Sequence, residues 1–329
     1  MEINDLDDYA EFRHLKYLLA IVEHKGLRAA AEALNITEPS LSRQAREFQQ
    51  HYKLKFYLRS KTGRIEITRT GQALPIIFGD LLEARDEAIA ALEAIERGEA
   101  ETLRIGCTPF IDKRICDKAV QLQRELVPAS KIKLSRDNTA PLLHELVHDH
   151  LDAAIVSLPV TREDLRIELV KRERFVVCIP ADHPLAKKPA LSAADLSHNL
   201  TVFRRPSLHP EAHARLLELL ADLGVWFEEH AHISHPHEML EAVKNGEGFG
   251  LIREGTPMIE GVATRPIIGV NWTFDTAVVF PRNPKSRIVP VIAKHLKRTF
   301  LRSDTSVTQK KGPAIVKEAE RHSQQKRIG

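Results

Sequence analysis

The sequence predicts a multi-domain protein in which a small all-α module and a long linker helix precede a larger C-terminal α/β domain. Three observations lead to this prediction. Apolar residues recur at helical spacing from residue 12 to residue 48, and a heptad pattern occupies residues 72–97. From residue 102 onward, strand and helix patterns alternate. The 329 residues are enough for two or three domains, each with its own core.

Three short helices are expected in the N-terminal module. Apolar residues keep helical spacing from Phe12 until Gly26, and the alanine-rich segment 28–35 follows as a second helix. Thr37 is a suitable N-cap for a third helix. Pro39 is tolerated in its first turn, where backbone N–H groups have no partner within the helix.

The third helix carries one apolar stripe, formed by Leu41, Ala45 and Phe48. Its Ser and Arg side chains lie off this stripe and are available for outside contacts. Residues 55–71 ("KFYLRSKTGRIEITRTG") then predict a strand, a turn and a strand, which form a small wing. The stretch 13–69 contains twelve Lys or Arg and five Glu. A polyanion is the natural partner of such a module, and the alternative is an ordinary solvated basic surface.

A long helix is expected over residues 72–97. Its apolar residues alternate spacings of three and four, which is the pattern of a coiled-coil seam. The seam consists of Leu74, Ile77, Leu81, Ala84, Ala88, Ala91 and Ile95. Because this helix lies between two domains, we interpret it as a dimer-forming linker; the alternative is a helix packed on its own domain.

Residues 102–302 predict βαβ units around a parallel sheet, followed by a second α/β block. The first block contains the strand "LRIGC", the helix "DKRICDKAVQLQREL", the strand "KIKLS", the helix "PLLHELVHDH" and the strand "DAAIVSL". The second begins near "RFVVCIP" and includes the strands "LTVF" and "VWFEEHAHI" and the helix "HEMLEAVKNG". The strand "TFDTAVVF" and the helix "VPVIAKHLKRTFL" close the array. The polar, basic residues 303–329 are expected to form a disordered tail.

Two segments of the N-terminal module carry a family resemblance. "AAEALNITEPSLSRQAREF" followed by "RSKTGRIEITRTG" resembles the winged helix-turn-helix of LysR-type transcriptional regulators, and the resemblance extends to about Arg302. It implies a winged helix-turn-helix over 12–71, a dimerisation helix over 72–97 and an effector-binding domain over 102–302. That domain would resemble a type 2 periplasmic binding protein with two Rossmann-like subdomains. The first would span about 102–173 and 266–302, and the second about 174–265.

The resemblance also implies a function. We expect a cytoplasmic, sequence-specific DNA-binding regulator that is not an enzyme and needs no cofactor. It would form a homodimer through the linker helix and, as a dimer of dimers, a homotetramer. Its partners would be double-stranded promoter or operator DNA and a small metabolite. The metabolite would change operator binding or DNA bending by shifting the two subdomains between open and closed arrangements.

The chain departs from the family pattern near the third helix. Thr37-Glu38-Pro39 stands where the family usually has Ser-Gln-Pro. A carboxylate lacks the donor of an amide and repels phosphate, although it can accept from cytosine N4, so base preference at Glu38 is expected to differ. Lys53 replaces a usual Gly in the turn after this helix and should change local conformation more than function.

We expect the third helix to lie in the major groove, with the wing along the backbone or minor groove. The residues expected at base edges are Glu38, Pro39, Ser42 and Arg43, those expected at phosphates are Ser40, Arg46 and Thr68, and those of the wing are Arg59, Lys61 and Arg64. Arg43 can bond to guanine O6 and N7 together, which is worth about 1–3 kcal/mol of discrimination. Alternatively, Ser42 satisfies only a backbone carbonyl and Lys61 is a solvated turn lysine.

Effector contacts are expected beyond the carboxyl ends of the strands, where ligands of open α/β sheets bind. By resemblance, Thr139 occupies the position of effector-contacting hydroxyls. The expected set is Thr108, Phe110, Thr139, Ser157, Phe203 and Arg204. Hydroxyls, helix N-termini and an Arg favour a small anionic metabolite. Helix capping alone would equally explain Thr108 and Thr139.

The cysteines and histidines form no recognised metal or catalytic motif. Cys107, Cys116 and Cys178 show no CxxC pair or disulfide-framework spacing, so we expect small buried thiols in a reducing compartment, with a redox sensor as the alternative. Residues 230–237 ("HAHISHPH") hold four histidines, but no Cys or carboxylate is placed to complete a metal shell. We therefore expect structural or surface histidines and no metal.

Two other functions fit parts of this pattern. One is an enzyme on a binding-protein-like fold, but the sequence contains no GxSxG, P-loop or correctly placed GxGxxG signature. The other is an architectural protein that binds DNA without preference, which the large ligand-domain pattern disfavours. No apolar run reaches the roughly 18 residues of a membrane span, and the acidic start "MEINDLDDYAEF" does not resemble a signal peptide. A cytoplasmic location without a membrane partner follows.

Overall fold

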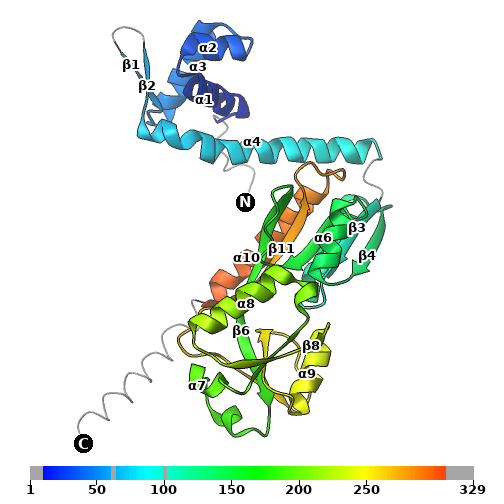
Figure 1. The fold of residues 1–329 in the computed structure, drawn as a ribbon. Helices are drawn as coiled ribbons and strands as arrows, with labels where there is room; N and C mark the ends of the chain where they lie inside the picture. Colours follow the sequence, from blue (N-terminus) through cyan, green and yellow to red (C-terminus); the bar gives the residue numbers. More distant parts are fainter. Residues whose placement is uncertain (1–9, 61–63, 99–101, 309–329) are drawn as a thin grey trace, which may run out of the picture. The chain divides into compact units, whose positions relative to one another are not determined.

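The computed structural model describes residues 10–60, 64–98 and 102–308, and the chain divides after Ala90 into two compact units. The elements of the first unit are α1 (Phe12–His24), α2 (Leu27–Ala33), α3 (Glu38–His51), β1 (Tyr57–Arg59), β2 (Ile65–Ile67) and most of α4 (Arg69–Glu96). Figure 1 shows them in blue and cyan. Leu18, Ile21 and Leu41 are fully buried in the core of this unit. The predicted three-helix module with a two-stranded wing is confirmed.

The turn between α2 and α3 depends on a left-handed residue. Asn35 has φ 54°, and its N–H and that of Ile36 donate to Glu32 O (3.1 Å) and Ala31 O (3.0 Å). This pattern closes the last turn of α2. Thr37 occupies the N-cap position of α3 as predicted, but its side chain makes no capping hydrogen bond. The backbone turn at Asn35 is therefore the feature that ends α2.

A second left-handed turn follows α3 at the position where Lys53 replaces the usual Gly. Lys53 has φ 53°. Its N–H donates to Gln50 O at 3.3 Å, and the N–H of Leu54 donates to Gln49 O at 3.0 Å. These two bonds are those of a Schellman motif, whose left-handed position favours Gly. Lys53 therefore holds the glycine conformation rather than changing it.

The wing is fastened to the first turn of α4. β1 and β2 pair antiparallel, with Leu58 opposite Glu66. Thr68 Oγ1 donates to Lys55 O (2.5 Å) and accepts from the N–H of Gly71 (3.1 Å). A Cβ on Gly71 would lie 2.0 Å from Phe56 O, so only glycine allows this close approach.

The structure corrects the predicted linker seam. α4 begins at Arg69, three residues before the expected start, and its Leu74 is buried in the core of the first unit. Ala91 and Ile95 pack in the core of the second unit. At both ends of the predicted seam, apolar side chains therefore pack against other residues of the same chain. Apolar side chains that remain exposed along α4 are Ile76, Ile77, Leu81, Ile89 and Leu92.

The second unit contains a seven-stranded sheet in the order β10-β6-β11-β5-β3-β4, with β9 also paired to β6. Its strands are β3 (Thr102–Cys107), β4 (Lys131–Arg136), β5 (Ala153–Ser157), β6 (Leu165–Pro180), β9 (Gly250–Arg253), β10 (Val262–Arg265) and β11 (Thr273–Pro281). β3, β4 and β5 are parallel, as predicted for βαβ units. β11 is antiparallel to both β5 and β6, because the chain returns through it from the second block.

β6 runs unbroken through the boundary expected between residues 173 and 174. Figure 1 shows it passing from the lobe with β3, β4 and α6 (Thr139–Val147) to the lobe with α7 (Ala193–Leu196) and α9 (Pro236–Lys244). The second lobe also contains β7 (Leu200–Arg204), which pairs parallel with β8 (Phe227–Ile233), two short 3₁₀ turns (Pro184–Lys187 and Pro206–Leu208) and α8 (Pro210–Asp222). β6 and β11 are thus strands through which the chain enters and leaves this lobe.

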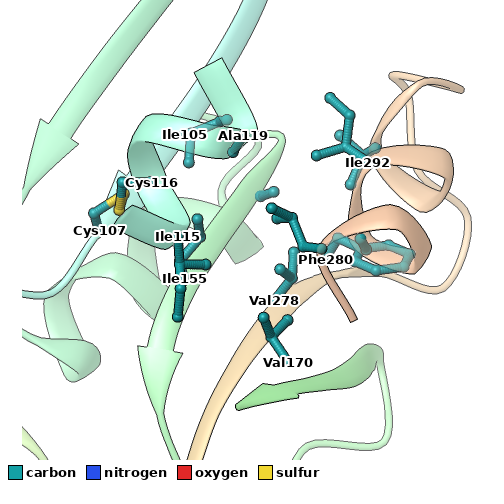
Figure 2. Packing of buried hydrophobic residues seen from close by; sticks show 14 of the residues in the cluster. Ile105, Cys107, Ile115, Cys116, Ala119, Ile155, Val170, Val278, Phe280 and Ile292 are labelled. Atoms are coloured by element: carbon teal, nitrogen blue, oxygen red, sulfur yellow. A yellow bond between two sulfur atoms is a disulfide. The ribbon is translucent and has the colours of Figure 1, made fainter. Parts of the chain in front are cut away.

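The first lobe has its core between the sheet and two helices, α5 (Lys113–Leu126) and α10 (Val289–Thr308). Figure 2 shows Ile115, Val278 and Phe280 packed in this core. On another part of the sheet, a Cβ on Gly106 would lie 2.6 Å from Leu142, so glycine allows α6 to approach β3 closely.

The cysteines correct a prediction made from the sequence. Cys107 at the end of β3 and Cys116 in α5 form a disulfide, with Cα atoms 6.8 Å apart (Figure 2). Cys178 is free and buried. The expectation of three thiols was wrong, because the turn from β3 into α5 brings together two residues whose spacing matches no known motif.

The C-terminal helix extends further than expected. α10 continues to Thr308, so residues 303–308 are helical rather than part of the predicted tail, and residues 309–329 lie outside the described part of the chain. Within the described residues, no helix is long and apolar enough to cross a membrane.

Candidate functional site

Helix α3 presents a polar face opposite its apolar stripe. Leu41, Ala45 and Phe48 are buried against the rest of the first unit. The predicted DNA-contacting residues of this helix are exposed or half-buried: Pro39, Arg43 and Arg46 are exposed, and Glu38, Ser40 and Ser42 are half-buried. Ser40 Oγ accepts a hydrogen bond from Gln44 Nε2 at 3.2 Å. The exposed Arg side chains are therefore free of the core and available to a polyanion.

Glu38 has a partner that the sequence did not indicate. Its carboxylate lies 4.0 Å from the guanidinium of Arg59 in β1, and both side chains are partly exposed. The pair joins the start of α3 to the wing. Because both groups are solvated, the pair contributes little stability. It places a positive wing residue beside the helix end expected in the groove.

The other residues expected to bind DNA from the wing differ in their exposure and hydrogen bonding. Arg64 is exposed directly before β2, and its N–H donates to Ser60 Oγ at 3.1 Å. Thr68, which was expected at a phosphate, instead uses its hydroxyl to bind Lys55 O and the N–H of Gly71. We therefore regard Thr68 as a residue that positions the wing. Lys61 lies outside the described residues.

A cavity of about 580 Å³ lies in the second unit. β6, β7, α8, β9 and β11 contribute to its wall. Two of the predicted effector residues, Phe110 and Ser157, line it. Most of the remaining lining is apolar, and includes Ile167, Phe175, Leu216, Leu219, Leu251, Trp272 and Phe274.

The other predicted effector residues are placed differently. Thr108 and Thr139 are buried, at 4% and 0% exposure, but they are not part of the cavity lining. Phe203 and Arg204 are the last residues of β7, and their side chains lie outside the described part of the structure. The next residue in the chain, Arg205, lines the cavity.

Buried hydroxyls occur at the carboxyl ends of the neighbouring parallel strands β3 and β5 and at the start of α6, which follows β4. Thr108, Thr139 and Ser157 are all at most 4% exposed, and their side-chain oxygens have no hydrogen-bond partner among the described residues. Asn138 Oδ1 and Thr276 Oγ1 share this condition. Buried polar groups in native proteins are nearly always hydrogen-bonded, so a cluster of unpartnered ones indicates a place for an external polar group.

The structure decides against helix capping as the role of these threonines. The N-cap of α5 is Asp112, whose carboxylate accepts from the N–H of Arg114 at 3.0 Å. Asn138 occupies the N-cap position of α6, and Thr139 lies one residue inside the helix with an unpartnered hydroxyl. Neither Thr108 nor Thr139 therefore caps a helix.

A buried ion network lies beside the cavity. Lys171 Nζ donates to Asp112 Oδ2 (2.8 Å) and to Glu173 Oε1 (2.7 Å), and Arg253 Nη1 donates to the same Glu173 oxygen (3.0 Å). Burial acts to raise the pKa of Asp112, but hydrogen bonds from Arg114 and Lys171 outweigh it and hold this pKa well below its usual range. The carboxylate is therefore ionised at neutral pH.

Arg253 connects this network to the loop after β3. Its Nε donates to Phe110 O (3.1 Å) and its Nη2 to Ile111 O (3.4 Å). Arg253 and Phe110 both line the cavity. The buried side chain of Arg253 on β9 thus contacts three features: the loop that follows β3, strand β6 and the cavity. The sequence pattern gave no signal for this role.

Several histidines of the second unit have protein partners. His209 Nε2 lies 2.8 Å from Ser157 O, and His213 Nε2 lies 3.6 Å from Glu229. Of the 230–237 cluster, His235 is paired with Glu238 and His237 with Glu241. In the described part of the chain, no group of three His, Cys, Asp or Glu residues is arranged to hold a metal ion. His209, the N-cap residue of α8, and His213 within α8 line the cavity, and their spacing of four residues was the available sequence signal.

Comparison with known proteins identifies the family. A family model described as "Bacterial regulatory helix-turn-helix protein, lysR family" matches residues 12–72, and one described as "LysR substrate binding domain" matches residues 96–300. The regulator BudR of Raoultella terrigena is 26% identical over 284 residues, covering 85% of this chain and 97% of BudR. YnfL, an uncharacterised HTH-type regulator of Escherichia coli strain K12, is 30% identical over 213 residues, covering 64% of this chain and 71% of YnfL.

The fold also matches solved structures. Full-length CbnR in complex with its target DNA superposes with a TM-score of 0.50 at 18% identity, covering 88% of this chain and 99% of CbnR. The two family matches together span the helix-turn-helix unit and nearly all of the α/β unit. The names of the relatives are those of regulators rather than enzymes. The chain belongs to the LysR family of DNA-binding transcriptional regulators.

Proposed function

We propose that this regulator acts in the cytoplasm, that α3 reads an operator in the major groove, and that a ligand bound between the lobes of the second unit alters the operator complex. The observation that carries the DNA role is the exposed polar face of α3, with Arg43 and Arg46 directed away from the buried stripe. Arg43 would bond to a guanine, while Arg46, Arg59 and Arg64 would neutralise phosphates. The CbnR structure, which contains target DNA, has the same fold.

Glu38 would act through the wing as well as at a base. Its carboxylate lies 4.0 Å from Arg59, so it would limit the positions that the guanidinium can adopt near the phosphate backbone. Lys61 and Ser40 are included as backbone contacts, and Pro39 and Ser42 as contacts at base edges. The positions of Pro39, Ser40 and Ser42 in the first turns of α3 support this part of the proposal.

The effector would place an anionic group against the unpartnered hydroxyls of Thr108, Thr139 and Ser157. The N-terminus of α6, a nine-residue helix, supplies N–H groups at the same place. A carboxylate can accept several such hydrogen bonds at once. The buried, unpartnered state of these oxygens supports this proposal, because filling the site would satisfy them.

Assembly as a homodimer, and as a homotetramer built from dimers, is part of the same proposal. It is supported by the exposed apolar side chains of α4, among them Ile77 and Leu81. Large exposed apolar residues along one helix are typical of association surfaces. Sedimentation of the Leu81→Glu variant tests this, since loss of dimer without loss of helix content is the expected result.

Arg43→Ala tests the DNA role. DNase footprinting on the DNA that flanks the coding region of this protein should give a discrete protected site, whereas an architectural protein would protect the DNA uniformly. At fixed salt, Arg43→Ala should lower the ratio of operator to scrambled-DNA affinity about 10- to 100-fold. Arg97→Ala, at the end of α4, is the control and should keep the ratio. An unchanged ratio in Arg43→Ala would contradict the base-reading role.

A further inference from the structure

The cavity is too large and too apolar for a small anionic metabolite alone. Its volume of about 580 Å³ lies in the range of roughly 300–1,000 Å³ typical of cavities that enclose drug-sized ligands. The apolar wall includes Leu216 and Leu219 of α8, Leu251 of β9, Trp272 directly before β11 and Phe274 within β11. A polar ion in this space would lose its hydration without gaining partners along most of the wall.

Most of the charged groups at the wall are already paired within the protein. Arg253 bonds to Glu173 at 3.0 Å and Arg215 to Glu218 at 2.9 Å. Asp275 lies 3.2 Å from Arg172, and His213 pairs with Glu229 at 3.6 Å. These pairs leave the apolar part of the lining to dominate the interaction with a ligand.

Ser157 is a buried polar residue of the cavity lining. Its side chain is 1% exposed, lines the cavity and has an unpartnered oxygen. Thr276, with another unpartnered hydroxyl, lies opposite Ser157 in the β5–β11 ladder. Ser157 therefore belongs both to the apolar cavity and to the group of buried hydroxyls that includes Thr108 and Thr139. Thr108 directly follows β3 and Ser157 is the last residue of β5, so the two residues lie at the same edge of the sheet, because these neighbouring strands are parallel.

We propose that the ligand is a monocarboxylate with an extended apolar body. Its carboxylate binds the buried hydroxyls around Ser157 and Thr139, and its apolar body fills the cavity between β6, α8 and β11. This inference deepens the proposed effector role and rests on the same site. It replaces the small anionic metabolite expected from the sequence with an amphipathic acid, because only such a molecule matches both parts of the site.

The test uses Trp272 as a reporter in the full-length protein. Of the two tryptophans, Trp272 lines the cavity, whereas Trp226 is 72% exposed and is not part of the lining. In a Trp226→Phe background, fluorescence titration should therefore report binding in the cavity. The probes are straight-chain carboxylates from butanoate to decanoate, octan-1-ol as a head-group control, and succinate as a small dianion.

Affinity should increase about fourfold for each added methylene, until the cavity is full. Octan-1-ol should bind at least about tenfold more weakly than octanoate, because it cannot form charge-assisted hydrogen bonds. Thr139→Val, which keeps the shape of the side chain, should lower the affinity for octanoate but leave the affinity for octan-1-ol unchanged. Affinity that does not depend on chain length, or succinate binding more tightly than octanoate, would overturn the proposal.

A matched pair of variants on α8 tests the location of the apolar body. Leu216 lines the cavity, and its neighbour Leu217 does not. In Leu216→Asn, the affinity for carboxylates should depend much less on their chain length. In Leu217→Asn, this dependence should be retained. Equal loss in both variants, or in neither, would contradict the placement of the chain.

DNA-binding anisotropy with the same acids separates this inference from the proposed effector role. If octanoate binds with the expected chain-length dependence but leaves the operator complex unchanged, the ligand class stands and the effector role fails. If succinate alters the operator complex and octanoate does not, the effector role stands and the ligand class is overturned. If octanoate alters the complex and Leu216→Asn removes the effect, both are supported.

Discussion

Replacing Lys171 with methionine is expected to destabilise the second unit strongly. The ammonium lies 2.8 Å from Asp112 and 2.7 Å from Glu173, and the Lys171 side chain is only 9% exposed. Methionine has a similar length and no charge, so the packing of the stem is largely kept. The two carboxylates then remain buried with one cation fewer.

The expected cost follows from this geometry. Removing one partner of a buried ion pair typically costs about 3–5 kcal/mol, because the other charge is left buried. Here Asp112 keeps Arg114, and Glu173 keeps Arg253, so the lower end applies, about 3 kcal/mol. With a urea slope of about 3 kcal/mol/M, the unfolding midpoint should fall by about 1 M.

Tryptophan fluorescence measures this unfolding selectively. Both tryptophans, Trp226 and Trp272, belong to the second unit, so the signal does not report on the helix-turn-helix unit. Lys285→Met is the control, because Lys285 pairs with Asp149 at 2.8 Å but both side chains are more than half exposed. This control should leave the midpoint unchanged. A shift in Lys171→Met no larger than that of the control would refute the stabilising role of the buried network.

Three further predictions concern other parts of the chain. Lys53→Gly should slow hydrogen exchange of the α3 amides about two- to fivefold. Gly removes the cost of about 1–2 kcal/mol of a left-handed L-residue, which is offset in part by its backbone entropy of about 0.5–1 kcal/mol. Lys53→Ala, which removes the same charge, should not slow the exchange. Alkylation of the unfolded, unreduced protein should label only Cys178, with three labels after reduction. In the native protein Cys178 should resist alkylation at pH 8, because burial raises the pKa of its thiol to about 12; labelling of all three without reductant would contradict the disulfide. Finally, the folded-state pKa of Asp112 lies below its unfolded value of about 4. Its stabilising contribution is therefore complete above about pH 4 and is lost as the pH falls toward the folded pKa. The urea midpoint should fall between pH 5 and pH 3, and an unchanged midpoint would contradict the assignment.

Local patterns predicted most of the helices and strands. Helical spacing in residues 12–48 and strand–helix alternation after residue 102 correspond to elements that the structure contains. These signals are local, because each element buries one face and its period is written in consecutive residues. The left-handed conformation at Lys53 was not predicted, because Lys in place of the usual Gly was expected to change the local conformation, whereas the structure keeps it.

Contacts between distant segments could not be predicted in this way. Lys171 and Asp112 are 59 residues apart, and Arg253 and Phe110 are 143 apart. No periodic pattern relates such positions, because their contact depends on where β6 and β9 lie in the finished sheet. The Cys107–Cys116 disulfide was missed although its residues are close in sequence, since the turn between β3 and α5 determines whether the two sulfur atoms meet.

Of the predicted effector residues, only Phe110 and Ser157 line the cavity, and most of the lining is apolar. Strand ends and helix starts indicated the hydroxyls of Thr108, Thr139 and Ser157, because polar residues there interrupt apolar patterns. The apolar lining of the cavity was not predicted, because Leu216 and Trp272 resemble ordinary core residues in the sequence. Whether an apolar residue faces a packed neighbour or a cavity depends on the tertiary structure alone.

Arg253 connects the cavity to the framework of the second unit. It lines the cavity, donates to Phe110 O and Ile111 O in the loop after β3, and bonds to Glu173 on β6. A ligand that fills the cavity therefore contacts a residue whose hydrogen bonds join β9 to the opposite lobe. Because a buried guanidinium must keep its partners, small displacements of Arg253 move these partners with it rather than leaving its N–H groups unpaired. On the ligand proposal, Arg253 would therefore relate occupation of the cavity to the relative placement of β9 and the loop after β3.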